Sequence, residues 1–275
     1  MEYSKQILTP LRLKAKIFGS MQITLPIAKP PWTALGKHLE SMVRKALHDY
    51  QMVEGVQKIA IALSGGKDSL ALLYFLKALS GYGYPNWIIY AVHVEGEFSC
   101  GPSITKSFLQ AVCKELDIPL IVKKSEKKLQ ELECYSCSRE RRKLLFEGAK
   151  EAGATTIAFG HHKDDSVQTL LLNLLHKAEF EGIMPKIKMV DYGVTIIRPL
   201  IFISEAEIIE FANMYQFKRI SCQCPIGQKS KRKQVESLIK QMESLFPRTR
   251  HNLFLAERRY GSNKALKPFN FEENR

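Results

Sequence analysis

Cysteine and acidic residues are both scarce in this chain of 275 residues. Six cysteines are present, and 28 Asp and Glu stand against 41 Lys and Arg, which gives a formal net charge of +13. Six cysteines are too few for a secreted scaffold held by disulfides, so we interpret them as reduced thiols available for metal or redox chemistry. The basic excess favours phosphate-rich polymers or anionic membrane surfaces as partners, although it says nothing by itself about chemistry.

A long apolar run is also lacking. The longest uncharged stretch, residues 78–94, is broken by glycine, proline and asparagine, so it predicts a helix end, a turn and a strand. The first residues mix basic and apolar side chains without the unbroken apolar core of a secretion signal. We therefore expect a cytoplasmic protein with no membrane span.

The sequence predicts three regions. Residues 1–35, which end near Pro30-Pro31, are expected to form a basic extension, and residues 218–275 a small helical appendage that carries cysteines. Between them, over 36–217, apolar strand-like runs alternate with helical patterns, and the expected strands are 58–63, 87–94, 119–122, 155–159 and 194–197. This alternation predicts an open, doubly wound α/β fold with a parallel sheet, in which ligands bind beyond the carboxyl ends of the strands.

The first chemical motif is Ser64-Gly65-Gly66-Lys67-Asp68-Ser69, between a predicted buried strand and a predicted helix. Two glycines let successive backbone amides point at a phosphate chain, and the helix N-terminus favours the same anion. The spacing is not that of a Walker A loop. For a Gly-Gly pair alone, an ordinary turn capped by Ser or Asp is the competing interpretation.

A second motif, Gly160-His161-His162-Lys163-Asp164-Asp165, follows another predicted strand and is expected at the same sheet edge. Paired carboxylates beside a triphosphate suit Mg²⁺. The alternative is that both Asp residues merely stabilise a helix N-terminus.

Four of the cysteines are clustered, as Cys134-x-x-Cys137 and as Cys222 and Cys224, whereas Cys100 and Cys113 stand alone. A Cys₄ zinc site, a dithiol couple and an iron–sulfur cluster held by three thiolates all remain open on spacing.

The stretch from residue 62 to residue 69 resembles the PP-loop of the N-type ATP pyrophosphatases. The resemblance implies that ATP is cleaved between its α and β phosphates to adenylylate a substrate oxygen. The residues it implies for nucleotide binding are Ala62, Ser64, Gly65, Gly66, Lys67, Asp68, Ser69, His93 and Gly160.

The order of motifs, with Gly-His-His-x-Asp-Asp, the Cys-x-x-Cys pair, Arg198-Pro199-Leu200 and a late cysteine, resembles the tRNA 2-thiocytidine synthetase (TtcA) family. It implies an ATP- and Mg²⁺-dependent tRNA sulfurtransferase that thiolates a cytidine, expected at position 32, and releases AMP and pyrophosphate. The implied roles are catalysis by Asp68, Asp164 and Asp165, with Mg²⁺ on the last two, and a 4Fe-4S cluster on Cys134, Cys137 and Cys222. Cys224 departs from the family spacing.

The basic runs are expected to follow the tRNA backbone, and comprise Arg139, Arg141, Arg142, Lys143, Lys231, Arg232 and Lys233. A sulfur donor such as a cysteine desulfurase is an expected partner, and a homodimer an expected assembly. Two alternatives remain: a lysidine synthetase, which needs no cysteines, and a basic RNA-binding module with a structural zinc site.

Overall fold

The structure is a computed structural model that describes residues 14–15, 23–26, 28–96, 102–126, 134–217 and 230–261. Its strands are β1 (Lys14–Ala15), β2 (Ile23–Thr24), β3 (Lys58–Ala62), β4 (Ile88–Glu95), β5 (Leu120–Lys124), β6 (Thr156–Ala158), β7 (Lys186–Met189) and β8 (Val194–Ile197). Its helices are α1 (Ala34–Asp49), α2 (Lys67–Leu79), α3 (Pro102–Glu115), α4 (Cys134–Glu151), α5 (Lys163–Lys177), the 3-10 helix η2 (Val190–Tyr192), α6 (Glu205–Met214), α8 (Lys231–Leu245) and α9 (Thr249–Tyr260).

One sheet organises the molecule, with strand order β5-β4-β3-β6-β8-β7. Neighbouring strands are parallel except the edge strand β7, which is antiparallel to β8. The chain runs outward from β3 to β5 and then returns to place β6 on the other side of β3. The carboxyl ends of β3 and β6 therefore form the topological switch point, where open α/β sheets bind their ligands.

The sheet separates two hydrophobic cores. Side chains alternate between the faces of a strand, and in β3 Ile59 and Ile61 enter the larger core while Ala60 enters the smaller one. The larger core contains residues of α1, α2, α3 and α6, whereas the smaller lies under α4 around Phe146. Helices thus cover both faces, which confirms the α/β layers expected from the alternation.

Several elements of the structure were not expected from the sequence, and β7 and α9 are the longest of them. Strand β7 has only four residues, and because two of them are the exposed Lys186 and Lys188, it contains no apolar run that would predict a strand. Helix α9 follows Pro247 and is predominantly polar, with Phe254 among its few buried residues. Among the described residues, no helix is long and apolar enough to span a bilayer.

The packed body begins ahead of the proline pair that the sequence suggested as its start. Leu25 and Ala28 are buried in the larger core, as is Trp32 just after the pair. The Tyr74 hydroxyl donates a hydrogen bond of 2.6 Å to the carbonyl of Pro26. The end of the expected extension is therefore part of the core.

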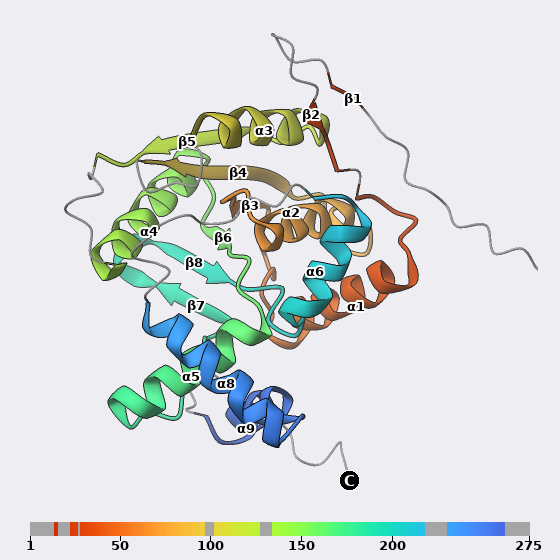
Figure 1. The fold of residues 1–275 in the computed structure, drawn as a ribbon. Helices are drawn as coiled ribbons and strands as arrows, with labels where there is room; N and C mark the ends of the chain where they lie inside the picture. Colours follow the sequence, from red (N-terminus) through yellow and green to blue (C-terminus); the bar gives the residue numbers. More distant parts are fainter. Residues whose placement is uncertain are drawn as a thin grey trace, which may run out of the picture.

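The described part of the expected C-terminal appendage, residues 230–261, is a pair of helices docked on α5, with α8 and α9 lying together at the end of the molecule away from α3 (Figure 1). Glu257 of α9 is buried in this contact and accepts hydrogen bonds of 2.9 Å from the Ser166 hydroxyl. Burial raises the pKa of Glu257 to about 7, against an ordinary value of 4.5.

This buried carboxyl predicts a pH-dependent stability. The folded state holds the proton of Glu257 more tightly than the unfolded chain does. Its contribution is therefore complete below about pH 4.5 and is lost as pH rises through about 7, a difference of about 3 kcal/mol. We expect Glu257→Gln to remove this loss, so that urea unfolding gives a variant more stable than wild type at pH 8 but not at pH 4.5. Parallel pH profiles for the two proteins would contradict the assignment.

Candidate active site

The loop after β3 is ordered by its own hydroxyl groups. The Ser64 hydroxyl accepts a hydrogen bond of 3.3 Å from the Gly66 amide and lies 3.1 Å from the Ser69 hydroxyl, which donates to the Gly66 carbonyl at 2.9 Å. Gly65 has a φ of +88°, a conformation that favours glycine. These contacts fix the loop before any ligand binds.

Helix α2 begins directly after this loop, at Lys67. Its N-cap is Gly66, and within the described chain no side chain caps the helix there. The first amides of α2 are therefore available to an anion, as the sequence predicted. Ala62 ends β3 immediately before the loop.

The second motif packs directly on the first. A Cβ atom added to Gly160 would lie 3.0 Å from the backbone carbon of Asp68 and 3.0 Å from the amide nitrogen of Ser69. Any side chain there would overlap backbone, so glycine allows the two loops to touch. The expectation that both motifs meet at one sheet edge is confirmed.

His162 lies among the three carboxylates that the sequence singled out. Its Nε2 is 3.8 Å from Asp68 Oδ1 and 3.4 Å from Asp165 Oδ2. Its Nδ1 is 3.8 Å from Asp164 Oδ2. Asp68 and Asp165 therefore converge on one ring nitrogen, and Asp164 lies on the other side of the ring.

The two neighbouring carboxylates Asp164 and Asp165 have different surroundings. Asp164 is buried, and its oxygens accept from Arg250 Nη1 at 2.8 Å and from the Glu205 amide at 2.7 Å. Asp165 accepts from the His162 amide at 3.1 Å and from Arg232 Nη1 at 2.9 Å, and the Arg232 side chain is 44% exposed. Asp164 is thus enclosed by protein donors, whereas the partner of Asp165 is open to solvent.

Arg250 is held by three carboxylates at once. Besides Asp164, its guanidinium donates to Glu236 at 3.0 and 3.1 Å and to Glu243 at 3.0 and 3.1 Å. Burial alone would lower the pKa of Arg250, but these carboxylates raise it well above its ordinary value. Arg250 could not be identified from the sequence, since it lies in the unexpected helix α9.

Arg198, which the sequence showed only as part of the Arg198-Pro199-Leu200 motif, makes two defined contacts in the structure. Its Nε donates to His161 Nδ1 at 3.3 Å, and Nη1 donates to the Met184 carbonyl. Burial and the charge of Arg198 lower the pKa of His161 to about 3. The imidazole is therefore neutral, with Nδ1 as acceptor.

His93, expected to face the nucleotide, lies beneath the loop. It is buried on β4, and its Nδ1–H donates to the Leu63 carbonyl at 2.8 Å. Its Nε2 is buried without a hydrogen-bond partner among the described residues. Burial lowers the pKa of His93, so the ring ties β4 to the loop as a neutral group.

The expected cluster ligands are only partly described. Cys134 and Cys137 occupy the first turn of α4, and Cys222 and Cys224 lie outside the described residues. Cys113, which stands apart from the clustered cysteines, is a buried thiol of α3 whose pKa is raised to about 12 by burial.

Of the basic residues expected to bind RNA, most are exposed on the first turns of α4 and α8. They are Arg139, Arg142, Lys143, Lys231 and Lys233, with Arg141 half-buried. Arg232 is exposed as well, but its guanidinium is paired with Asp165.

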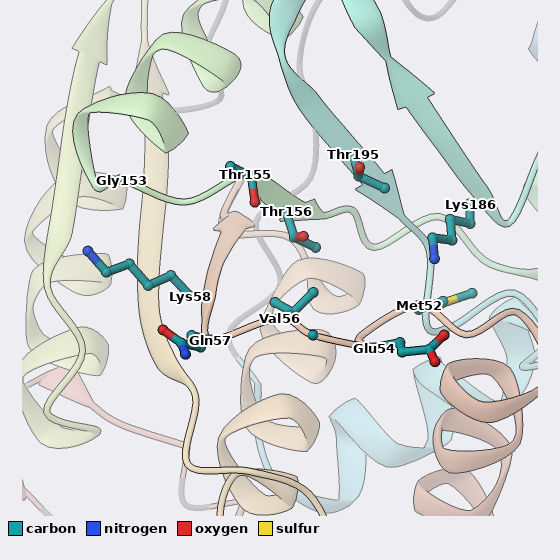
Figure 2. Close-up of a pocket in the computed structure, with 11 residues that line it drawn as sticks. Met52, Glu54, Val56, Gln57, Lys58, Gly153, Thr155, Thr156, Lys186 and Thr195 are labelled. Atoms are coloured by element: carbon teal, nitrogen blue, oxygen red, sulfur yellow. The ribbon is translucent and has the colours of Figure 1, made fainter.

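A cavity of about 430 Å³ lies at the opposite edge of the sheet (Figure 2). It is lined by Lys58 and Thr156, which begin β3 and β6, and by Thr195 of β8. This is the amino edge of the parallel strands, away from the two loops, so the cavity does not belong to the site.

The donor set at the loops fits a nucleotide-bound Mg²⁺. Within the described residues, no group of three or more His, Cys, Asp or Glu side chains is arranged to hold a metal. Mg²⁺, however, usually takes one or two carboxylates and completes its shell with phosphate oxygens and water. Asp68 Oδ1 and Asp165 Oδ2 lie 3.8 and 3.4 Å from His162 Nε2, so two carboxylates converge beside the loop, where Lys67 Nζ is 3.1 Å from Asp68 Oδ1.

The fold and this site define the class of protein. Residues 35–236 match the PP-loop domain family, so the chain belongs to that family of nucleotide-binding enzymes. Relatives of the chain identify a narrower family within this class.

The tRNA-cytidine(32) 2-sulfurtransferase of Paraburkholderia phytofirmans is 35% identical over 231 residues, covering 81% of this chain and 68% of that protein. The protein of the same name from Herminiimonas arsenicoxydans is 35% identical over 229 residues, with 80% and 71% covered. The chain belongs to the tRNA-cytidine(32) 2-sulfurtransferase family, so these relatives favour neither a lysidine synthetase nor an RNA-binding module.

A solved structure agrees with this assignment. The U34-tRNA thiolase NcsA from Methanococcus maripaludis, solved with its 4Fe-4S cluster, superposes with a TM-score of 0.67 at 26% identity. The match covers 81% of this chain and 78% of that one.

The different surroundings of the two carboxylates predict different mutant stabilities. Asp164→Asn removes a buried charge that faces half-buried Arg250, and we expect a loss of about 1.5–3 kcal/mol. Asp165→Asn affects a half-exposed pair and should cost less than about 1 kcal/mol. Urea unfolding of both variants checks this difference, and equal losses would contradict it.

Proposed function

We propose that this protein is an ATP-dependent tRNA sulfurtransferase that converts a cytidine, expected at position 32 of tRNA, to 2-thiocytidine. The observation that carries the proposal is the contact between the PP-loop and the Gly160–Asp165 loop at the switch point, in a chain of this family. AMP and pyrophosphate would be the other products.

Activation of the base is the task of the two loops. The C2 oxygen of a pyrimidine is a poor leaving group, and adenylylation makes it a good one. The loop amides and the N-terminus of α2 would bind the phosphates of ATP, with Lys67 adding a positive charge that stabilises the departing pyrophosphate. The resemblance implied Mg²⁺ on Asp164 and Asp165. Because both oxygens of Asp164 accept hydrogen bonds from protein donors, we place Mg²⁺ instead on Asp165 and Asp68, where it would neutralise phosphate charge when bound. Asp164, enclosed by Arg250 and Glu205, would support the site.

Sulfur delivery is the task of the cysteines. Cys134 and Cys137 are three positions apart at the start of α4, so they share a helix face whose N-terminal end favours thiolates. With Cys222 they would hold a 4Fe-4S cluster, which when bound offers one open iron to sulfide. The cluster in NcsA supports this assignment. A sulfur donor such as a cysteine desulfurase would supply the sulfur.

The tRNA would lie along the basic first turns of α4 and α8. Cytidine thiolation needs an unpaired base, because base pairing hides the C2 edge, and an anticodon-loop nucleotide meets this need. A cytoplasmic location and a homodimer complete the proposal.

Nucleoside mass spectrometry tests the function directly. We expect tRNA from a strain that lacks this protein to lose 2-thiocytidine alone. Expression of wild type should restore it, and expression of Asp68→Ala should not, because that carboxylate lies at the loop. Unchanged 2-thiocytidine in the deletion strain would overturn the proposal.

The ligand count of the cluster gives a separate prediction. We expect anaerobically purified protein to be brown, and Cys134→Ala, Cys137→Ala and Cys222→Ala each to lose the iron chromophore and thiolation. Cys224→Ala is the matched control and should retain both. Stoichiometric zinc without iron would reject the cluster. Colour loss in Cys224→Ala but not in Cys222→Ala would show that Cys224, and not Cys222, is the third ligand.

A further inference from the structure

The ammonium group of the loop lysine is already paired with carboxylates. Lys67 Nζ lies 2.8 Å from Glu205 Oε1 and 3.1 Å from Asp68 Oδ1. Burial lowers the pKa of Lys67, but Asp68 and Glu205 outweigh it and raise the pKa above its ordinary value. The lysine is therefore charged, and its charge is balanced before any phosphate arrives.

Glu205 is held in place by the interior of the molecule. It is the first residue of α6, and its amide donates to Asp164 Oδ2 at 2.7 Å. The other oxygen of Asp164 accepts from Arg250 at 2.8 Å. A continuous series of short polar contacts thus runs from α9 to the loop lysine.

The role of Glu205 is not explained by capping of α6. The Ser204 amide donates to Glu207 Oε2 at 2.8 Å, so Glu207 completes the capping box with Ser204. Glu205 instead directs its carboxylate across to α2. Its side chain is 40% exposed and that of Lys67 is 22% exposed, so the pair lies at the open edge of the site.

A phosphate chain at the N-terminus of α2 would compete with Glu205 for the same ammonium group. We propose that Glu205 is the exchangeable counter-ion of Lys67. Without ligand, the Glu205 carboxylate pairs with the ammonium group of Lys67 and holds it in place. When ATP binds, its phosphates replace Glu205 as the partner of Lys67, and breaking the ion pair lowers the affinity for ATP. When pyrophosphate leaves, the ion pair forms again. This inference rests on the proposed function only in taking ATP as the ligand of the loop.

Equilibrium binding of α,β-methylene ATP and of pyrophosphate, both with Mg²⁺, tests the proposal. We expect Glu205→Gln to bind both ligands roughly two- to five-fold more tightly, the range of a partly exposed ion pair. Glu207→Gln is the matched control, because it lies in the same helical turn, keeps its cap and does not touch Lys67. Its Kd values should equal those of wild type. Should Glu205→Gln fold poorly by thermal unfolding, Glu205→Ser should give the same tightening.

A double-mutant cycle distinguishes an effect of Glu205 through its ion pair with Lys67 from direct repulsion between Glu205 and the phosphates. If Glu205 acts through the lysine, Glu205→Gln should change nothing in a Lys67→Ala background. An equal gain in both backgrounds, or unchanged or weaker binding by Glu205→Gln alone, would overturn the inference while the proposed function stands. Failure of wild type to bind the ATP analogue would overturn both.

Discussion

The arrangement of the site depends on the hydrogen bonds that the carboxylate of Asp164 accepts. This carboxylate is buried at the start of α5, and its two oxygens accept from the first amide of α6 and from Arg250 of α9. A buried charge without such donors would carry a large desolvation cost, so these three helices are held at one point. The C-terminal helices are therefore part of the support of the nucleotide loop, and Glu205 reaches Lys67 because its backbone is fixed in this way.

Much of the site could be predicted because parallel sheets obey strict geometric rules. Both loop motifs follow strands of one parallel sheet. The carboxyl ends of such strands lie at one edge, so the two motifs had to lie at that edge. The structure places Gly160 against the backbone of Asp68 and Ser69, as this rule requires. The strands themselves were recognisable because buried parallel strands are short and almost wholly apolar, as in β3.

The partners of these motifs could not be predicted, because they are set by packing between elements distant in sequence. Arg250 lies 86 positions beyond Asp164, and Glu205 lies 138 positions beyond Lys67. A residue pattern reports spacing along one helix or strand, whereas these pairs depend on how α6 and α9 dock. Helix α9 was itself missed, since a predominantly polar helix after a proline has no apolar stripe to reveal it.

The same long-range packing relates the cysteines of α4 to the nucleotide loops. Burial and the charge of Arg142 on α4 lower the pKa of Arg198 to about 10, and Arg198 donates to His161 in the second loop. Helix α4 connects β5 to β6 within the parallel part of the sheet, so it runs back along the sheet and begins at the carboxyl ends of the strands. The first turn of α4, which contains Cys134 and Cys137, is therefore on the same edge of the sheet as the two loops.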